Sequence, residues 1–133
     1  MGAWGFKIFE NDDAADFVAE FENSGAIAVA DALDVACNNP DYIEAPDGSV
    51  ALAAAAIVAA ANGKSEFLSK PAQTALRTVS NWQALSGLKG KAIQAVECVS
   101  SPNSELMELW AEAAPADAAN FKNELNRLRA ALR

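Results

Sequence analysis

The sequence predicts an all-α protein, a compact single-domain bundle of about six to seven helices over residues 1–133 with an irregular apolar segment at its N-terminus. Apolar residues recur at spacings of three and four through most of the chain, and no stretch shows the alternation of a β-strand. Hydrophobic residues make up 52 % of the chain, with seven Gly and five Pro, which is the composition of a globular domain. A length of 133 residues is also usual for one domain.

The first predicted helix follows the apolar N-terminal segment. Asn11, Asp12 and Asp13 suit its N-cap and first turn, because their side chains accept hydrogen bonds from free backbone N–H groups. The helix is expected to end at residues 23–25, where Asn, Ser and Gly follow one another. Its apolar stripe consists of Ala14, Phe17, Val18 and Phe21.

The next two predicted helices are strongly apolar. One covers residues 26–37 and is ended by Asn38, Asn39 and Pro40. Residues 42–47 are expected to form a loop. Residues 50–61 contain eight Ala, and the Asn-Gly pair that follows is typical of a helix C-terminus. Because small side chains let neighbouring helices approach closely, this helix is expected to be the central, most buried one.

The second half of the chain carries four more predicted helices. One runs from Ser69 to about Leu85 and is ended by Gly87, and the next covers residues 88–99. A third starts between residues 101 and 103 and ends at Pro115. Asp117 is expected to cap the last helix, which runs to residue 132.

The net charge of −8 is unevenly distributed. Residues 1–63 hold 11 of the 18 acidic residues and one of the ten basic residues. Because carboxylates repel phosphate groups, we expect neither nucleic-acid binding nor binding to a membrane surface. The chain does not begin like a secretory signal, and its longest apolar run, 12 residues, is too short to cross a bilayer. These observations predict a cytoplasmic protein.

The two cysteines, Cys37 and Cys98, lie in apolar helical surroundings, and we expect two buried thiols rather than a disulfide. The sequence does not indicate whether they meet in space. The chain has no His and no Cys-x-x-Cys motif, so we expect no structural metal, and no motif indicates a cofactor.

Trp4 stands between Gly2 and Gly5 in the N-terminal segment. We expect Trp4 to anchor one end of the core, with the glycines permitting a close or left-handed backbone. The alternative is that the indole covers a ligand or contacts a partner.

The densest carboxylates are Asp12, Asp13 and Asp16, with Glu10 and Glu20 nearby. Their spacing lacks the Asp-x-Asp-x-Asp-Gly loop of a calcium site, which favours helix capping and a solvated face over cation binding.

Asp31 and Asp34 lie one turn apart on an otherwise apolar predicted helix. We expect them to mark its solvated side, with acid–base chemistry as the alternative.

Motifs of nucleophilic and phosphate chemistry are not evident. No His is available to activate a Ser or Cys, and there is no Gly-x-Ser-x-Gly turn. The stretch Asn62-Gly63-Lys64-Ser65 matches only the tail of a phosphate-binding loop.

Five stretches of the chain together resemble a bacterial family known as domain of unknown function 4259. They are MGAWG at residues 1–5, FENDDAADF at 9–17, YIEA at 42–45, ALAAA at 51–55 and SELMELW at 104–110. The resemblance covers essentially the whole chain and implies a small single-domain bacterial protein, with no reaction, cofactor or catalytic residue to carry over. The family pattern often places a Glu in the Ala-rich segment, where this chain has apolar residues such as Ala56 and Ile57.

The charge distribution and the lack of catalytic motifs predict a non-enzymatic interaction or regulatory module. Its acidic N-terminal face would meet a basic protein partner. The face is predicted to consist of Asp12, Asp13, Asp16, Glu20 and Glu22.

Two alternatives stay open. The basic residues near the C-terminus could dock on the acidic half of a second copy; they are Lys122, Arg127, Arg129 and Arg133. The chain could instead be a small-ligand or metal-dependent enzyme that uses Asp12, Asp16, Asp31 or Asp34. The candidate binding residues are therefore Trp4, Asp12, Asp13, Asp16, Glu20, Asp31 and Asp34.

Overall fold

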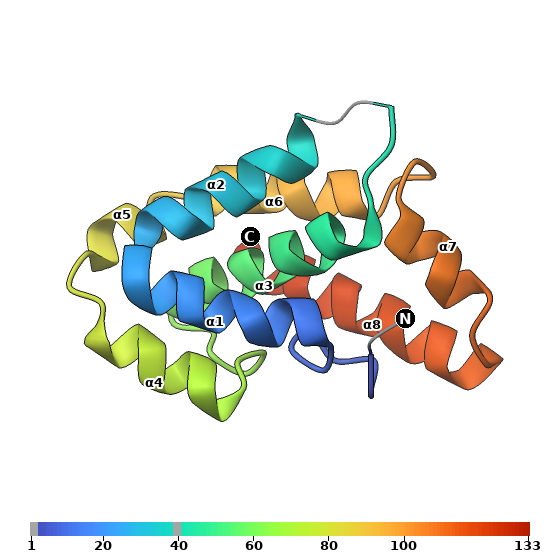
Figure 1. Cartoon of the computed structure of the whole chain (residues 1–133), viewed down its shortest axis with the longest axis horizontal. Coiled ribbons are helices and arrows are strands. Elements are labelled where there is room, and N and C mark those ends of the chain that lie inside the picture. Colours follow the sequence, from blue (N-terminus) through green and yellow to red (C-terminus); the bar gives the residue numbers. More distant parts are fainter. Residues whose placement is uncertain (1–2, 39–40) are drawn as a thin grey trace.

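The computed structural model describes residues 3–38 and 41–133, and this part of the chain contains eight helices and no β-strand (Figure 1). The predicted all-α class is confirmed, with one helix more than the upper expected number. In chain order the helices are α1 (Asp12–Ser24), α2 (Ala26–Cys37), α3 (Ala45–Ala61), α4 (Lys70–Thr78), α5 (Trp82–Ser86), α6 (Lys89–Val99), α7 (Glu105–Ala111) and α8 (Pro115–Leu132).

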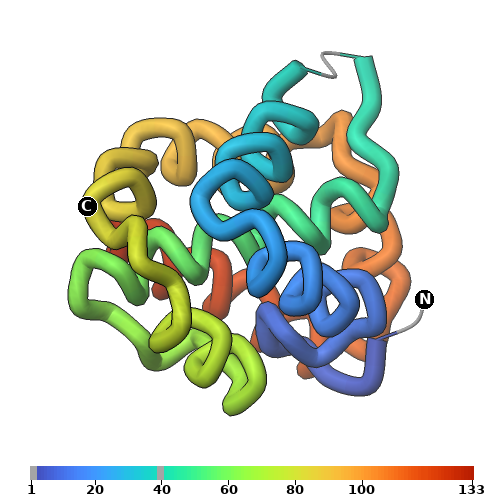
Figure 2. The backbone as a smooth tube through the Cα atoms, turned by 60° about the vertical axis from the view of Figure 1, so that its left-hand side comes forward, coloured from blue at the N-terminus to red at the C-terminus, as the bar shows by residue number. Residues whose placement is uncertain are grey.

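The Ala-rich helix α3 is the centre of the fold, as its small side chains predict. It packs against α1, α2, α5, α6, α7 and α8, and Figures 1 and 2 both show it surrounded by the other helices. Every residue from 51 to 60 is buried, and most of these side chains are wholly inaccessible to solvent. A methyl side chain on every side of a helix lets six neighbours come close, which explains why the most apolar helix lacks a polar face.

The predicted start of α1 and the end of α3 are both confirmed. The side-chain oxygen of Asn11 accepts a hydrogen bond from the backbone N–H of Ala14 at 2.8 Å, so Asn11 is the N-cap of α1. Helix α3 ends at Ala61 with Asn62 as its C-cap, and the next residue, Gly63, has a φ of 96°. The N–H of Lys64 donates to the carbonyl of Ala59, a bond that closes the last turn of α3.

Gly25 forms the turn between α1 and α2 and so sets how the two helices are oriented relative to each other. Its φ of 59° is a left-handed conformation that strains any residue with a β-carbon, and its N–H donates to the carbonyl of Phe21. The chain therefore turns sharply within one residue between the two helices. In Figure 1, α1 and α2 diverge from this point, and α3 lies between and behind them. Asn39 and Pro40, predicted to end the second helix, lie outside the described residues; Asn38 is its C-cap.

The single helix predicted from Ser69 to Leu85 is wrong, because the chain breaks between α4 and α5. Val79 has a ψ of 128°, which is extended backbone. A β-branched residue followed by Ser and Asn is a poor helix former, since the short polar side chains compete for backbone hydrogen bonds. The predicted entry at Ser69 is confirmed, because its hydroxyl accepts from the N–H of Ala72.

Helix α3 begins earlier than residue 50, because the predicted loop at residues 42–47 is only partly a loop. Pro46 occupies the first turn of the helix, where its missing N–H costs nothing. The carboxylate of Glu105 on α7 accepts a hydrogen bond from the N–H of Ala45 at 2.7 Å and caps α3 from another helix. A contact from a residue 60 positions away is invisible to local sequence patterns.

Two of the stretches that carry the family resemblance meet at this point. Ile43 pairs with Ser104 in an isolated parallel bridge, with backbone hydrogen bonds to Asn103 and Glu105. The hydroxyl of Tyr42 donates to Glu108 at 3.2 Å. The YIEA and SELMELW stretches therefore join α3 to α7, and their role in the described structure is architectural.

Two other predicted boundaries of the late helices need correction. Asp117 is not a cap: α8 begins at Pro115, and Asp117 lies in its first turn, where a carboxylate still favours the helix dipole. The preceding helix starts later than residue 103, because the hydroxyl of Ser104 accepts from the N–H of Met107 and is the N-cap of α7.

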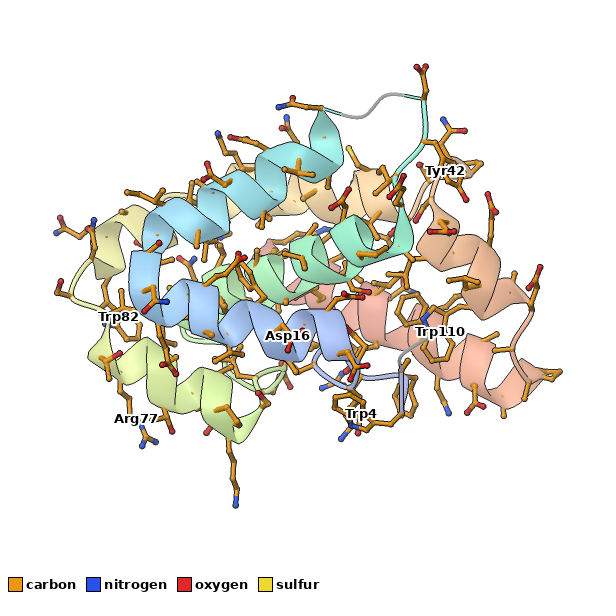
Figure 3. All side chains as sticks on the ribbon, viewed as in Figure 1. Trp4, Asp16, Tyr42, Arg77, Trp82 and Trp110 are labelled. Carbon is orange, nitrogen blue, oxygen red and sulfur yellow. The ribbon has the colours of Figure 1, made fainter. Side chains whose placement is uncertain are left out.

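The N-terminal segment folds back on itself instead of inserting Trp4 into the core. The N–H of Trp4 donates to the carbonyl of Glu10 at 3.0 Å, and Ala3 bridges Asn11. Ile8 and Phe9 are buried, but the side chain of Trp4 is 62 % exposed, so the predicted anchor role is wrong. Figure 3 shows Trp4 projecting beside the start of α1. The stacked pair of Trp110 and Phe121, with ring centroids 4.8 Å apart, lies among the core side chains instead.

Gly5 lies close to the flexible end of the Glu10 side chain. A β-carbon there would collide with the carboxylate of Glu10, and the same carboxylate accepts a hydrogen bond from the N–H of Lys7. The segment is therefore closed by its own backbone and by Glu10. Gly2 lies outside the described residues.

Candidate functional site

A groove of about 570 Å³ lies between α1, α2 and the start of α3. Gly25 turns the chain sharply between α1 and α2, and Asp47 and Val50 at the start of α3 complete the lining of the groove. Its lining residues are Glu20, Asn23, Ser24, Ile27, Ala28, Asp31, Ala32, Val35, Asp47 and Val50.

The groove has a strongly acidic lining. Glu20 comes from α1, Asp31 from α2 and Asp47 from α3, and no Lys or Arg is among its described lining residues. Within residues 3–38 and 41–133, none of the three carboxylates forms an ion pair; the four pairs found there involve other acids. The negative charge of the groove is therefore not neutralised by the described part of the chain.

The rim of the groove carries unusually exposed apolar side chains. Ile27 is 70 % exposed and Val35 is 42 % exposed, while Ala28 and Ala32 beneath them are buried. Ile27, Asp31 and Val35 are four residues apart, so they share one face of α2. Most surface helices have polar residues on the face that is exposed to solvent, whereas this face of α2 carries branched apolar residues. The groove thus combines an apolar floor and rim with uncompensated carboxylates.

Some of the predicted site residues line this groove, and the others lie elsewhere on the molecule. Glu20 and Asp31 come together in it, as described above. Asp12 and Asp16 are exposed on α1 at spacings of four from Glu20, so they continue the same acidic row along that helix. Figure 3 shows Asp16 on α1. Asp13 faces a small hollow beside the N-terminal segment. The five acids predicted to form one face do not all share it, because Glu22 lines a separate hollow between α1, α2 and the α4–α5 connection.

Asp34 points away from the groove. Its carboxylate accepts a bond from the ammonium of Lys91 on α6 at 2.9 Å, and both side chains are about half exposed. Asp31 and Asp34 are three residues apart, but Asp31 lines the groove while Asp34 ties α2 to α6. The structure does not bring them together as one acidic pair.

The basic residues near the C-terminus are partly engaged within the molecule. Arg127 pairs with Glu66 at 3.0 Å and with the buried Glu124 at 2.8 Å, and its guanidinium lies over the ring of Phe67. Arg129 pairs with Glu97 at 2.8 Å. These contacts connect α8 to the segment after α3 and to α6.

Sequence reasoning missed Ile27, Val35 and Asp47 as site residues. A signal existed for the first two, because an apolar residue outside the predicted stripe of its helix is a candidate for a binding surface. No sequence pattern indicated Asp47, because its position near the other acids depends on α3 beginning earlier than predicted.

The described residues contain neither a metal-binding cluster nor a membrane-spanning helix. Among residues 3–38 and 41–133, no group of three or more His, Cys, Asp or Glu side chains is arranged to hold a metal ion. No helix in this part of the chain has the length and apolar character required to span a membrane.

Comparison with known proteins identifies a family but no characterised relative. The family model described as Domain of unknown function (DUF4259) matches residues 2–124. No curated protein and no solved structure matches the chain.

Proposed function

Because the chain belongs to the DUF4259 family, which has no assigned activity, we propose its function from the groove: it is an interaction module that binds a basic, amphipathic segment of another protein. The observation that carries the proposal is the combination of three uncompensated carboxylates with the exposed side chains of Ile27 and Val35. A segment with Lys or Arg beside apolar residues complements both features.

The size of the groove suits a few side chains of such a segment. Its volume of about 570 Å³ is comparable to small-ligand sites, but the groove is open, and its three carboxylates come from three different helices. Burying the exposed part of Ile27 supplies affinity at roughly 25 cal/mol per Å² of apolar surface. The carboxylates contribute mainly to association rate and to selection against acidic partners.

We favour a different protein over a second copy of the chain as the occupant of the groove. Two of the four basic residues near the C-terminus, Arg127 and Arg129, already pair with internal carboxylates, so docking them on another copy requires breaking those pairs. The proposal also takes residues 1–133 as a single helical domain that acts in the bacterial cytoplasm. No nucleic acid is expected in the groove, because its carboxylates repel phosphate.

The experiment compares three forms of the immobilised chain: wild type, Asp31→Lys and the control Glu112→Lys. Glu112 is exposed at the end of α7 and lies outside the groove. Glu112→Lys changes the net charge as much as Asp31→Lys does, but it leaves the groove unchanged. Proteins captured from a lysate of the host at low salt are identified, purified and measured for affinity.

We expect the wild type and Glu112→Lys to bind with similar Kd. Asp31→Lys should weaken binding at least about tenfold, which corresponds to ~1.4 kcal/mol. Raising the salt concentration should weaken wild-type binding, because exposed charges are screened. Equal affinity for Asp31→Lys and wild type contradicts the proposal.

A further inference from the structure

The two cysteines, which are 61 residues apart in the chain, meet between α2 and α6. The Sγ atoms of Cys37 and Cys98 are 3.2 Å apart, and both residues are free thiols of intermediate exposure. A disulfide has an S–S distance of about 2.05 Å, so the two sulfur atoms are in contact but not bonded. The expectation of two thiols is confirmed, but they are only partly buried.

The thiol pair is reachable from solvent. Both cysteines line an open hollow of about 310 Å³, which also includes Glu97, Ser101 and Asn103. A small disulfide can therefore approach either sulfur without unfolding of α2 or α6. Buried structural thiols are inert because reagents cannot reach them, and the hollow gives this pair the access that a core lacks.

We propose that Cys37 and Cys98 are a reversible redox site that forms an intramolecular disulfide by exchange with a low-molecular-weight disulfide. This inference rests on the sulfur geometry and the hollow and is independent of the groove. The bond would join the C-terminal end of α2 to α6, next to the ion pair of Asp34 and Lys91.

The exchange proceeds in two balanced steps. The thiolate of Cys98 attacks the small disulfide, forming a mixed disulfide and releasing one small thiolate. The sulfur of Cys37 then attacks Cys98, which forms the internal disulfide and expels the second small thiol with the proton from Cys37. In sum, two protein thiols are oxidised and one small disulfide is reduced to two thiols.

The surroundings of Cys37 make it the second thiol to react. Burial, together with the contact to Cys98 and the nearby carboxylate of Asp34, raises the pKa of Cys37 to about 12, against the opposing effect of Lys91. A thiol that keeps its proton at neutral pH is a slow attacker of a free disulfide. Held 3.2 Å from its target, it is well placed for the intramolecular step.

The test equilibrates the full chain, without oxygen, against graded ratios of reduced and oxidised glutathione. Free thiols are then blocked by alkylation, and the intact mass is measured. We expect both alkylatable thiols to be lost together as the oxidised fraction rises, and digestion without reduction should yield the Cys37 and Cys98 peptides joined. Adding reduced glutathione should restore both thiols.

Cysteine-to-serine variants test the order of the steps. Cys37→Ser should accumulate glutathione on Cys98, whereas Cys98→Ser should react more slowly at Cys37. The proposal is overturned if the wild type keeps both thiols at every ratio, or if it carries two glutathione adducts instead of the internal bond. Both contrary outcomes are read from the wild type, so they do not depend on the folding of a variant.

Discussion

Truncating two isoleucines, Ile27 and Ile57, should have very different consequences for stability. The side chain of Ile57 on α3 is fully buried, whereas that of Ile27 on α2 is 70 % exposed. Changing Ile57 to Ala removes three buried carbon atoms, worth about 2.4 kcal/mol of transfer free energy, and the cavity term brings the total loss to about 2–5 kcal/mol. At Ile27 only the buried fraction is lost, about 0.7 kcal/mol, and the better helix propensity of Ala offsets about half of it.

Urea unfolding of the wild type, Ile27→Ala and Ile57→Ala measures both free energies. We expect the midpoint of Ile57→Ala to fall by roughly 1–2 M and that of Ile27→Ala to stay near the wild type, with the m-value unchanged in both. The reasoning is refuted if Ile27→Ala loses as much stability as Ile57→Ala. Ile27 would then be a packing residue, and the apolar rim of the groove would not be available to a partner.

The remaining predictions concern the N-cap and the cysteines. Asn11→Ala should lower the free energy of unfolding by about 1 kcal/mol in the same assay, because α1 loses the side-chain acceptor of its first turn; no measurable change would argue against the cap. Oxidation of Cys37 and Cys98 should stabilise the fold by up to about 4 kcal/mol, since the bond closes a loop between residues 61 positions apart. The Tm should rise by roughly 10 °C in calorimetry, and an unchanged or lower value would indicate a strained bond. Burial raises the pKa of Cys37 from 9.0 to about 12, so between these pH values the folded chain keeps a proton that the unfolded chain has lost. The reduced wild type should therefore lose more stability than Cys37→Ser as the pH rises from 9 to 12, and parallel pH profiles would contradict the shift.

Local patterns predicted those parts of the fold that depend on local chemistry. Three features follow from neighbouring side chains: the cap at Asn11, the left-handed Gly63 after the C-terminus of α3, and the burial of the Ala-rich helix. Local patterns are insufficient where a distant residue determines the structure. Glu105 caps α3 from 60 positions away in the chain, and the helix therefore extends into the predicted loop. The prediction that Trp4 anchors the core rests on an aromatic residue between glycines in an apolar segment, but the fold-back of residues 3–11 leaves its side chain exposed.

The candidate site was only partly predictable for the same reason. Glu20 and Asp31 were singled out as carboxylates, but their meeting in one groove depends on the turn at Gly25. Asp31 and Asp34 look equivalent in sequence, and only the position of α6 shows that Asp34 pairs with Lys91. The approach of Cys37 to Cys98 depends equally on the packing of α2 against α6.

Site-specific photo-crosslinking is the most direct test of the groove as a protein-binding site. A photoreactive amino acid is placed at Ile27 in one form of the chain and at the control position Glu112 in another, and each is illuminated in the host at native expression. We expect a discrete adduct from position 27 alone, attached to a partner segment that contains Lys or Arg beside apolar residues, and its loss when Asp31→Lys is added. An absence of adducts at position 27, or the same adducts from both positions, would contradict the account.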